Sequence, residues 1–329
     1  MSDFSSLLNN FKNSSSKRER TKETTKSDDE KRQRVNDDDD DEEEVIHDLH
    51  ELSIKIDFLC IGAQKSGTTW LHEMLRKIPS AVGLPKYPMK EVHFWDWNRY
   101  KGLGWYSQQF ASTNNNIALG EITPCYMALP EHHIYEIRRL FPSVRIVFLA
   151  RDLVDRAWSA MIMELQNDLR GLKPGEFDTH NDTKETFSSE NYDDDYFMGK
   201  LNTLTHRARS DYASALSRWL KYFPKEQILI LDYTTIATKP RDLLSRVLKH
   251  ISKEDVEEIL QKNITTQDLS SRINTSNIET SKNTIRASLR TKMESYLRPY
   301  AIEFNKLLQK NWPDSNNWKL CEYPLKESS

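Results

Sequence analysis

A buried strand that passes through a short glycine-containing loop into a helix most restricts how this chain can fold. The loop reads Gln-Lys-Ser-Gly-Thr-Thr-Trp over Gln64–Trp70 and follows an apolar run. Such a turn exposes backbone N–H groups at a helix start, where phosphate groups bind well. The nucleotide-triphosphate loop reads G-x-x-x-x-G-K-[ST]. Gly62 and Gly67 keep that spacing, but Thr68 stands at the lysine position and the lysine is Lys65. This shift favours a phosphate-bearing donor other than ATP.

Hydrophobic periodicity along the rest of the chain alternates between strands and helices. Strands are predicted over Ile54–Ile61, Val144–Ala150 and Gln227–Leu231. Helices are predicted over Thr69–Ile78, Pro130–Leu140, Leu153–Leu165, Tyr212–Tyr222, Arg241–Ile251, Lys253–Gln261 and Ile285–Lys310, with an interruption of the last at Pro299. This alternation predicts an α/β protein with a P-loop-like three-layer fold, in which helices flank a central parallel β-sheet. The polar and weakly periodic residues 167–199 predict a surface insertion.

The first 52 residues differ from the rest in composition. They hold 9 Lys+Arg against 16 Asp+Glu and carry −7, whereas the other residues carry +4. A segment of this kind cannot bury enough apolar surface to offset its ordering entropy. We therefore expect a disordered charged tail over residues 1–52 and a domain over residues 53–325. The basic clusters Lys17–Arg18 and Lys31–Arg34 fit a solvated tail or a bipartite nuclear-localisation signal.

Cysteine usage and hydropathy indicate the compartment. Cys60, Cys125 and Cys321 show no zinc-binding spacing and no disulfide framework, so reduced thiols are expected. The sequence has no apolar run of the about 18 residues that a membrane helix needs, and no signal peptide is visible. We expect a soluble cytoplasmic protein, with nuclear entry through the basic clusters as an option.

Three clusters, in a fixed order, resemble one family. The loop at Gln64–Trp70 is followed by Lys-Glu-Val-His-Phe-Trp-Asp over Lys90–Asp96, and then by Arg151 with Ser159 eight residues later. Further matches are Gly102–Tyr106, Gly120–Tyr126 and Asp211–Pro224. The chain resembles sulfotransferases that use 3′-phosphoadenosine-5′-phosphosulfate (PAPS), and most resembles the heparan-sulfate (N-/3-O-sulfotransferase) type. The resemblance runs from about residue 56 to 235 and more loosely to 312.

The resemblance implies a cofactor site. Lys65 would neutralise charge on the bridging oxygen and the departing 5′-phosphate. Arg151 would offer a bidentate fork to the 3′-phosphate, and Ser159 would add a donor. The residues implied to bind the 5′-phosphosulfate are Lys65, Ser66, Gly67, Thr68, Thr69 and Trp70. Sulfuryl transfer depends on positioning and charge stabilisation, much as phosphoryl transfer does, so no metal is expected to be required.

The second cluster supplies the candidate acid–base residues. Glu91 would take the proton of the acceptor, for which its pKa would need to be raised by partial burial. In an extended segment Glu91 and His93 share a face, so His93 would contact the acceptor or orient Glu91. Asp96 would point to the other face unless a turn intervenes. Trp95, Trp97 and Trp105 fit core packing or a stacking platform for a sugar.

The resemblance weakens at two places. Where many members of the heparan-sulfate type have a lysine, this chain has Ile122, which removes a positive contact to a polyanionic acceptor. The C-terminal cofactor loop, glycine-rich and flanked by cysteines in the family, corresponds to 272–290 without either feature. Lys282, Arg286 or Arg290 would cover the adenosine phosphates instead. We therefore expect the acceptor hydroxyl or amine to belong to another carbohydrate or a small molecule, and no nucleic-acid partner.

Each assignment has an alternative that the sequence leaves open. Lys65 would then be a solvent-facing lysine, and Glu91 would form a structural ion pair. His93 would be a core histidine, and Arg151 would pair with Asp152 or Asp155. For the whole chain the alternatives are an ATP-dependent P-loop phosphotransferase and a non-catalytic nucleotide-binding scaffold. The phosphotransferase is disfavoured by Thr68 and by the lack of a Mg²⁺-binding aspartate after a strand. The scaffold would need no Glu91.

Overall fold

The computed structural model describes residues 54–86, 89–110, 117–169, 171, 188–252, 255–270 and 284–313. The tail expected over residues 1–52 lies outside the described residues. Within them, five strands form one parallel sheet in the order β2-β3-β1-β4-β5. Their bounds are Phe58–Gly62 (β1), Val82–Gly83 (β2), Ala118–Ile122 (β3), Arg145–Ala150 (β4) and Ile228–Asp232 (β5). The expected parallel sheet is confirmed.

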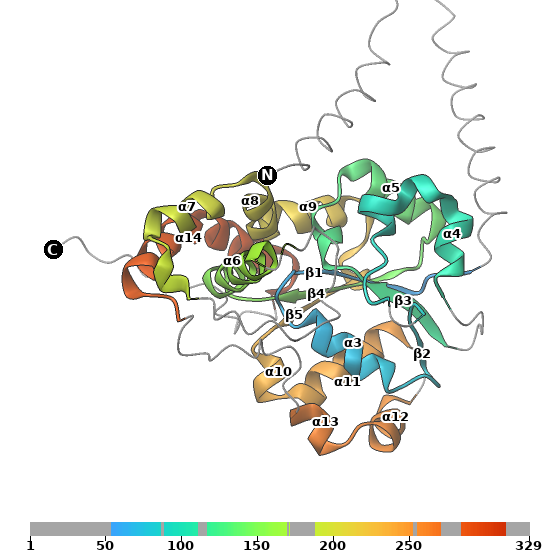
Figure 1. Cartoon of the computed structure of the whole chain (residues 1–329). Helices are drawn as coiled ribbons and strands as arrows, with labels where there is room; N and C mark the ends of the chain where they lie inside the picture. The colour runs from blue at the N-terminus through green and yellow to red at the C-terminus, as the bar shows by residue number, and fades with distance from the viewer. Residues whose placement is uncertain are drawn as a thin grey trace, which may run out of the picture. The chain divides into compact units, whose positions relative to one another are not determined.

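Helices cover both faces of the sheet, which gives the expected three layers (Figure 1). The α-helices are α3 (Thr68–Arg76), α4 (Gly102–Gln108), α5 (Glu131–Leu140), α6 (Leu153–Leu169), α7 (Asp194–Leu201), α8 (Leu204–Ser210), α9 (Tyr212–Tyr222), α10 (Thr235–Thr238), α11 (Pro240–Ile251), α12 (Val256–Asn263), α13 (Thr266–Ser270) and α14 (Ala287–Asn311). Single turns are η1 (Phe94–Asn98), η2 (Arg99–Lys101), η3 (Pro124–Ala128), η4 (Ser189–Asn191) and η5 (Lys225–Gln227). None of the described helices has both the length and the apolar character needed to cross a bilayer.

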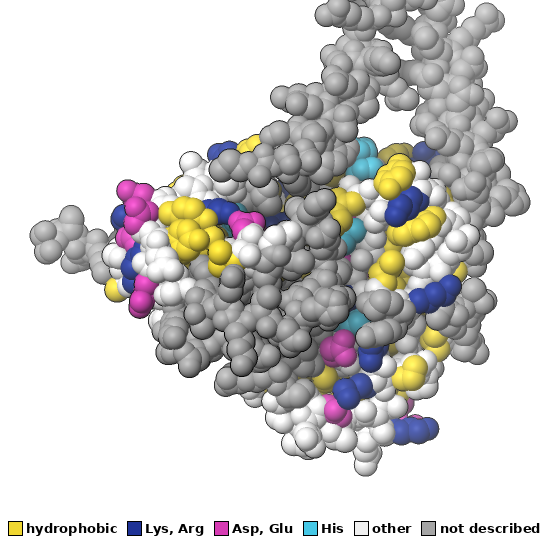
Figure 2. Space-filling model, in the orientation of Figure 1, with side chains coloured by type: hydrophobic (Ala, Val, Ile, Leu, Met, Phe, Trp, Pro, Cys, Tyr) yellow, Lys and Arg dark blue, Asp and Glu magenta, His cyan; other side chains and the backbone are white. Residues whose placement is uncertain are grey.

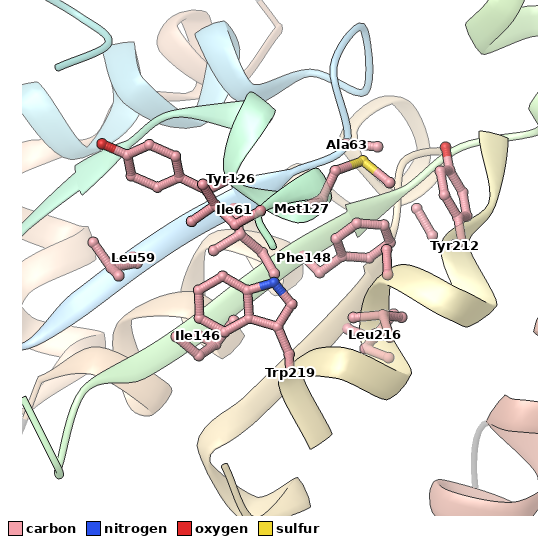
Figure 3. Packing of buried hydrophobic residues seen from close by; sticks show 14 of the residues in the cluster. Leu59, Ile61, Ala63, Tyr126, Met127, Ile146, Phe148, Tyr212, Leu216 and Trp219 are labelled. Atoms are coloured by element: carbon pink, nitrogen blue, oxygen red, sulfur yellow. The ribbon is translucent and has the colours of Figure 1, made fainter. Parts of the chain in front are cut away.

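The two central strands are almost continuous apolar runs, as parallel strands covered on both faces usually are. All of β1, and all of β4 except its first residue, are buried. One face packs against α5, α6, α9 and α14, and the other packs against α3, α11 and α12. Figure 3 shows the first of these cores, in which Ile61 of β1 and Phe148 of β4 lie near Leu216 and Trp219 of α9.

Strand β3 was not predicted, because its sequence Ala-Leu-Gly-Glu-Ile reads poorly as a buried strand. Gly120 is required by its neighbour: a Cβ there would lie 2.2 Å from the carbonyl oxygen of Phe58 on β1. The carboxyl group of Glu121 is fully buried and accepts hydrogen bonds from three hydroxyl groups. Close backbone approach and side-chain hydrogen bonding therefore stabilise a strand that lacks the usual composition.

Two expectations about the second half of the chain need correction. The insertion expected over residues 167–199 is helical at both ends, because α6 runs to Leu169 and α7 begins at Asp194 and buries Phe197; residues 172–187 lie outside the described residues. The interruption expected at Pro299 is absent from α14, which continues through it. Buried Leu297 and Ala301 on either side of the proline pack into the core and hold both halves in one helix.

Candidate active site

The predicted cofactor loop lies at the carboxyl edge of the sheet, where the strand order changes direction. The chain leaves β1 toward β2 and β3 on one side and returns to β4 on the other. Ligands of open α/β sheets bind in the crevice at such a switch point. The loop at Gln64–Trp70 follows β1, and Arg151 follows β4 directly. A backbone hydrogen bond of 2.9 Å from Ala63 N to Leu149 O joins the two strand ends.

The loop has the backbone geometry that a phosphate group requires. Gly67 caps α3 with a left-handed φ of 81°, and a Cβ there would lie 2.3 Å from Cδ1 of Ile236. The first turn of α3 carries neither an acidic residue nor a side-chain cap, so its N–H groups and positive dipole end are not matched by a carboxylate. The hydroxyl of Ser66 is buried without a hydrogen-bond partner among the described residues. These features fit a bound phosphate.

Positive charge gathers around the loop. Lys65 is half-buried, and its Nζ lies 3.6 Å from Sδ of Met163. Burial, together with the nearby charges of Arg151 and Lys90, lowers the pKa of Lys65 to about 8. The backbone of Lys65 is left-handed with φ 66°, a conformation that costs a residue with a Cβ on the order of 1 kcal/mol. A lysine with a left-handed backbone, close to two other cations, fits an anion site.

Arg151 closes the loop from the β4 side. Its Nη1 donates a 2.7 Å hydrogen bond to the carbonyl oxygen of Lys65, and its guanidinium lies 4.5 Å from the ring centre of Tyr233. The carboxylate of Asp155, one alternative partner, instead accepts a 2.5 Å hydrogen bond from Arg290. Ser159 lies two turns further along α6 and is half-buried. Tyr233, which directly follows β5, was not singled out from the sequence, and the structure places its ring against Arg151.

The other loop side chains point in different directions. Thr68 and Trp70 are buried, and Trp70 packs in the core with α11. Thr69 faces the second cluster, because its Oγ1 accepts a 2.7 Å hydrogen bond from Nζ of Lys90. The same Nζ lies 2.8 Å from Oε1 of Glu91. Lys90 was part of the recognised motif but was not assigned a role, and the structure gives it the link between the loop and Glu91.

Glu91, His93 and Asp96 form a chain of contacts. Nε2 of His93 lies 3.2 Å from Oε2 of Glu91, and Nδ1 lies 2.8 Å from Oδ2 of Asp96. The segment is not extended throughout: His93 has a left-handed φ of 51° and starts the π-helical turn η1. That turn is the reason why Asp96 meets His93 instead of pointing away. Among described residues other than glycine, only Lys65 and His93 have positive φ.

The pKa values of Glu91 and His93 correct one expectation. Burial alone would raise the pKa of Glu91, but the hydrogen bond from His93 and the charge of Lys90 outweigh it and lower that pKa to about 2. Burial alone would lower the pKa of His93, but hydrogen bonds to Asp96 and Glu91 outweigh it and raise that pKa to about 9. The raised pKa expected for Glu91 is therefore wrong: at neutral pH Glu91 is ionised beside an imidazolium.

A buried layer beneath the cluster fixes its backbone. The hydroxyl of Tyr126 accepts a 2.8 Å hydrogen bond from the N–H of Phe94 and donates to Glu121. Thr123 Oγ1 accepts a 3.2 Å hydrogen bond from the N–H of Val92 and also donates to Glu121. Burial raises the pKa of Glu121 to about 7, against the opposing effect of these hydroxyl groups. Sequence reasoning recognised this stretch as a motif but did not foresee its supporting role.

The three tryptophans differ in whether they pack in the core or offer an exposed ring for stacking. Trp95 is completely buried, and Trp105 packs partly buried against the same core. Trp97 is 37% exposed and stacks on His93, with ring centres 3.7 Å apart and planes within 5°. Core packing therefore holds for Trp95, whereas Trp97 presents an aromatic face beside the Glu91 cluster.

Two of the residues expected to cover the adenosine phosphates form ion pairs with neighbouring helices. Arg286 forms an ion pair with Asp194 of α7, and Arg290 pairs with Asp155 of α6. Arg286, directly before α14, is therefore connected to α7, and Arg290, within α14, is connected to α6. Lys282 lies outside the described residues.

Both the sequence and the fold of this chain resemble those of known sulfotransferases. A family model described as the sulfotransferase domain matches residues 55–309. Heparan sulfate glucosamine 3-O-sulfotransferase 5 of Mus musculus is 29% identical over 210 residues, which cover 63% of this chain and 56% of that protein. The bifunctional heparan sulfate N-deacetylase/N-sulfotransferase 3 of Homo sapiens is 30% identical over 202 residues, which cover 59% of this chain and 22% of that protein.

The match therefore spans little more than half of the first relative and less of the second. Among solved structures, a sulfotransferase from Alicyclobacillus acidocaldarius superposes with a TM-score of 0.54 at 18% identity, and the match covers 80% of this chain and all of that one. That likeness shows a shared fold. Because the family model matches residues 55–309, which are most of this chain, the chain belongs to the sulfotransferase domain family.

Proposed function

We propose that this protein is a PAPS-dependent sulfotransferase that moves a sulfuryl group from PAPS to an acceptor hydroxyl or amine and releases 3′,5′-ADP. The observation that carries the proposal is the pairing of the Lys65 loop with Arg151 across the β1–β4 switch point. The loop accounts for the 5′-phosphosulfate, and Arg151 accounts for the 3′-phosphate that ATP lacks. The catalytic domain is proposed to span residues 53–325.

The residues divide the chemistry between them. Lys65 stabilises the negative charge that develops on the bridging oxygen as the S–O bond to the 5′-phosphate breaks. The N–H groups of Gly67, Thr68 and Thr69 hold the departing phosphate. Glu91, ionised at neutral pH, takes the proton from the acceptor as its oxygen or nitrogen bonds to sulfur. No metal is required in this scheme, because lysine and arginine carry the charge stabilisation.

His93 positions Glu91 and balances its charge. It holds the Glu91 carboxylate through Nε2 and is itself held by Asp96 through Nδ1. Lys90 couples the two halves of the site, because it contacts both Thr69 of the cofactor loop and Glu91. Ordering of the loop by the donor therefore also orders the proton acceptor.

The acceptor is proposed to be a carbohydrate or a small molecule. The names of the relatives point to heparan sulfate, a polyanionic carbohydrate. Ile122, which is fully buried in this chain, offers no positive charge to such a polymer. On the face shown in Figure 2, basic and acidic side chains of the described residues are interspersed. An acceptor with fewer charges than heparan sulfate, stacked on the exposed face of Trp97, fits these observations better.

Ligand-dependent thermal unfolding tests the donor. A ligand at about one hundred times its dissociation constant stabilises a protein by about 2.7 kcal/mol. We expect 3′,5′-ADP and PAPS to raise the melting temperature and ATP–Mg²⁺ to leave it unchanged. Equal or greater stabilisation by ATP–Mg²⁺ would favour the phosphotransferase alternative. Transfer of labelled sulfate from PAPS to a panel of carbohydrates and small molecules then separates an enzyme from a nucleotide-binding scaffold.

A further inference from the structure

Three side chains of different chemistry converge beside the Glu91 cluster. His93 directly precedes the turn η1, Asp96 lies within it, and Cys125 lies in the neighbouring turn η3. A ring nitrogen of His93, a carboxylate oxygen of Asp96 and the sulfur of Cys125 all lie within 4.8 Å of one another. Among the described residues, this is the one such group with metal-ligating atoms. Neither the sulfotransferase reaction nor the family comparison assigns a role to Cys125.

The ligand set fits a thiophilic divalent cation. Zinc binds imidazole nitrogen, carboxylate oxygen and thiolate sulfur, and sites with three protein ligands keep a fourth position open. Metal-binding histidines usually donate their other ring N–H to a carboxylate, which fixes the ring. His93 already has this arrangement, because its Nε2 contacts Glu91 while Nδ1 faces Asp96. Oδ1 of Asp96 is buried and has no hydrogen-bond partner among the described residues, so it has a free lone pair to offer.

Hydrogen bonds to a buried tyrosine hold the backbone that carries these ligands. Tyr126, next to Cys125, accepts hydrogen bonds from the N–H groups of Phe94 and Trp95 and so ties η3 to η1. Rigid support of this kind favours metal binding, because the ligands need little ordering. Two features oppose binding. Zinc–ligand bonds of about 2.0–2.3 Å require the ligand atoms to draw closer together, and the guanidinium of Arg209 lies 3.9 Å from the Cys125 sulfur.

We propose that His93, Asp96 and Cys125 form a binding site for a thiophilic divalent cation such as Zn²⁺, and that the bound ion inhibits sulfuryl transfer. Binding forms bonds from the metal to nitrogen, oxygen and sulfur and releases the protons of the Cys125 thiol and of His93 Nδ1. A divalent charge beside Glu91 then opposes transfer of the acceptor proton to it. The inhibitory part rests on the proposed function of Glu91, whereas metal binding itself does not.

Cobalt substitution tests binding without any assay of activity. Titration of metal-free full-length protein with Co²⁺ should give one equivalent bound, with a thiolate-to-cobalt charge-transfer band. Added Zn²⁺ should abolish the band by displacing Co²⁺. Cys125→Ser should remove the band and weaken Zn²⁺ binding by about tenfold or more. Cys321→Ser is the matched control and should change neither. A missing band, or an unchanged band in Cys125→Ser, would overturn the site.

Inhibition is tested separately on the active protein. Zn²⁺ should abolish sulfate transfer in the wild type at the concentration that fills the cobalt-defined site, and a chelator should restore the rate. Cys125→Ser should keep its basal rate and lose most of its sensitivity to Zn²⁺. Equal sensitivity of wild type and Cys125→Ser would overturn the inhibitory role. If no sulfate transfer is found with any acceptor, the proposed function fails while the cobalt measurement still decides the metal site.

Discussion

The carboxylate of Glu91 lies 3.2 Å from Nε2 of His93, and this contact determines the state of both groups. Together with the charge of Lys90 it lowers the pKa of Glu91 to about 2, and together with Asp96 it raises that of His93 to about 9. Between these values the pair is a carboxylate and an imidazolium. A carboxylate with a low pKa is a weak base in the resting protein, but it is fully ionised and needs no prior loss of a proton. The nearby Lys90 connects it to the cofactor loop.

Replacement of Glu91 by glutamine tests its role in proton transfer. Glu91→Gln keeps the shape of the side chain and removes the proton acceptor, so the transfer rate should fall by about 10²–10⁴-fold. Stabilisation by 3′,5′-ADP should persist, because Glu91 does not contact the nucleotide in the proposed scheme. Glu73→Gln, which changes a carboxylate of α3 that pairs with Arg76, is the control and should keep its activity. Wild-type rates in Glu91→Gln would exclude Glu91 as the base.

The pH dependence of kcat/KM should show a basic limb and no acidic limb in the neutral range. Glu91 is ionised above its pKa of about 2, so its protonation does not limit the rate between about pH 5 and 7. The rate should fall as Lys65 loses its proton, since its pKa is about 8. Lys65→Arg keeps the charge at high pH, so the limb should move toward the pKa of His93, about 9. A limb that stays in place in Lys65→Arg would assign it to another group.

Discrimination of the 3′-phosphate should depend on Arg151. Arg151→Lys keeps the charge but loses the planar fork, and a hydrogen bond to a charged group contributes about 1.5–3 kcal/mol. The affinity for 3′,5′-ADP should therefore fall by about 10- to 100-fold, as measured by calorimetry. The affinity for 5′-AMP is the internal control, because Arg151 also contacts the carbonyl oxygen of Lys65. An equal loss for both nucleotides would mean that Arg151 only supports the loop.

The buried Glu121 should make stability depend on pH. Its pKa of about 7 in the folded protein exceeds the ordinary value of 4.5, so folding favours the protonated form. The stabilisation is complete below about pH 4.5 and is lost as pH rises through about 7, a change of about 3 kcal/mol in the free energy of unfolding. Urea unfolding of wild type and Glu121→Gln at pH 5 and pH 8 measures it. The difference between the two pH values should shrink in Glu121→Gln, and an unchanged difference would contradict the assignment.

The sequence predicted those elements whose signal is local. Strands β1 and β4 were found because they are apolar runs, and α9 was found to the residue because its apolar positions repeat with a helical period. The loop around Gly67 was identified because its conformation needs a glycine. Strand β3 was missed because part of what stabilises it is not local: the backbone of Phe58 on β1 and the hydroxyl of Tyr106 on α4 come from other segments.

The site was predictable in its residue types and less so in its electrostatics. Period-two alternation placed Glu91 and His93 together, but the turn at His93 that adds Asp96 leaves no clear trace in the sequence. The pKa of Glu91 was expected in the wrong direction, because burial was weighed without the neighbouring cations. Cys125 near Asp96 depends on the packing of η3 against η1, which no spacing along the chain reveals.

The glycine at the start of α3 should be needed both for stability and for nucleotide binding. Gly67→Ala places a Cβ in a left-handed backbone at about 1–2 kcal/mol, and that Cβ would meet Ile236 at 2.3 Å. We expect a lower urea midpoint and at least a tenfold loss of affinity for 3′,5′-ADP. Gly104→Ala is the control, because Gly104 lies within α4 with no atom within 4 Å of its added Cβ. It should leave affinity unchanged and stabilise the protein by up to about 1 kcal/mol. If Gly67→Ala behaves like Gly104→Ala in both measurements, the loop does not need the bend that the phosphate cradle requires.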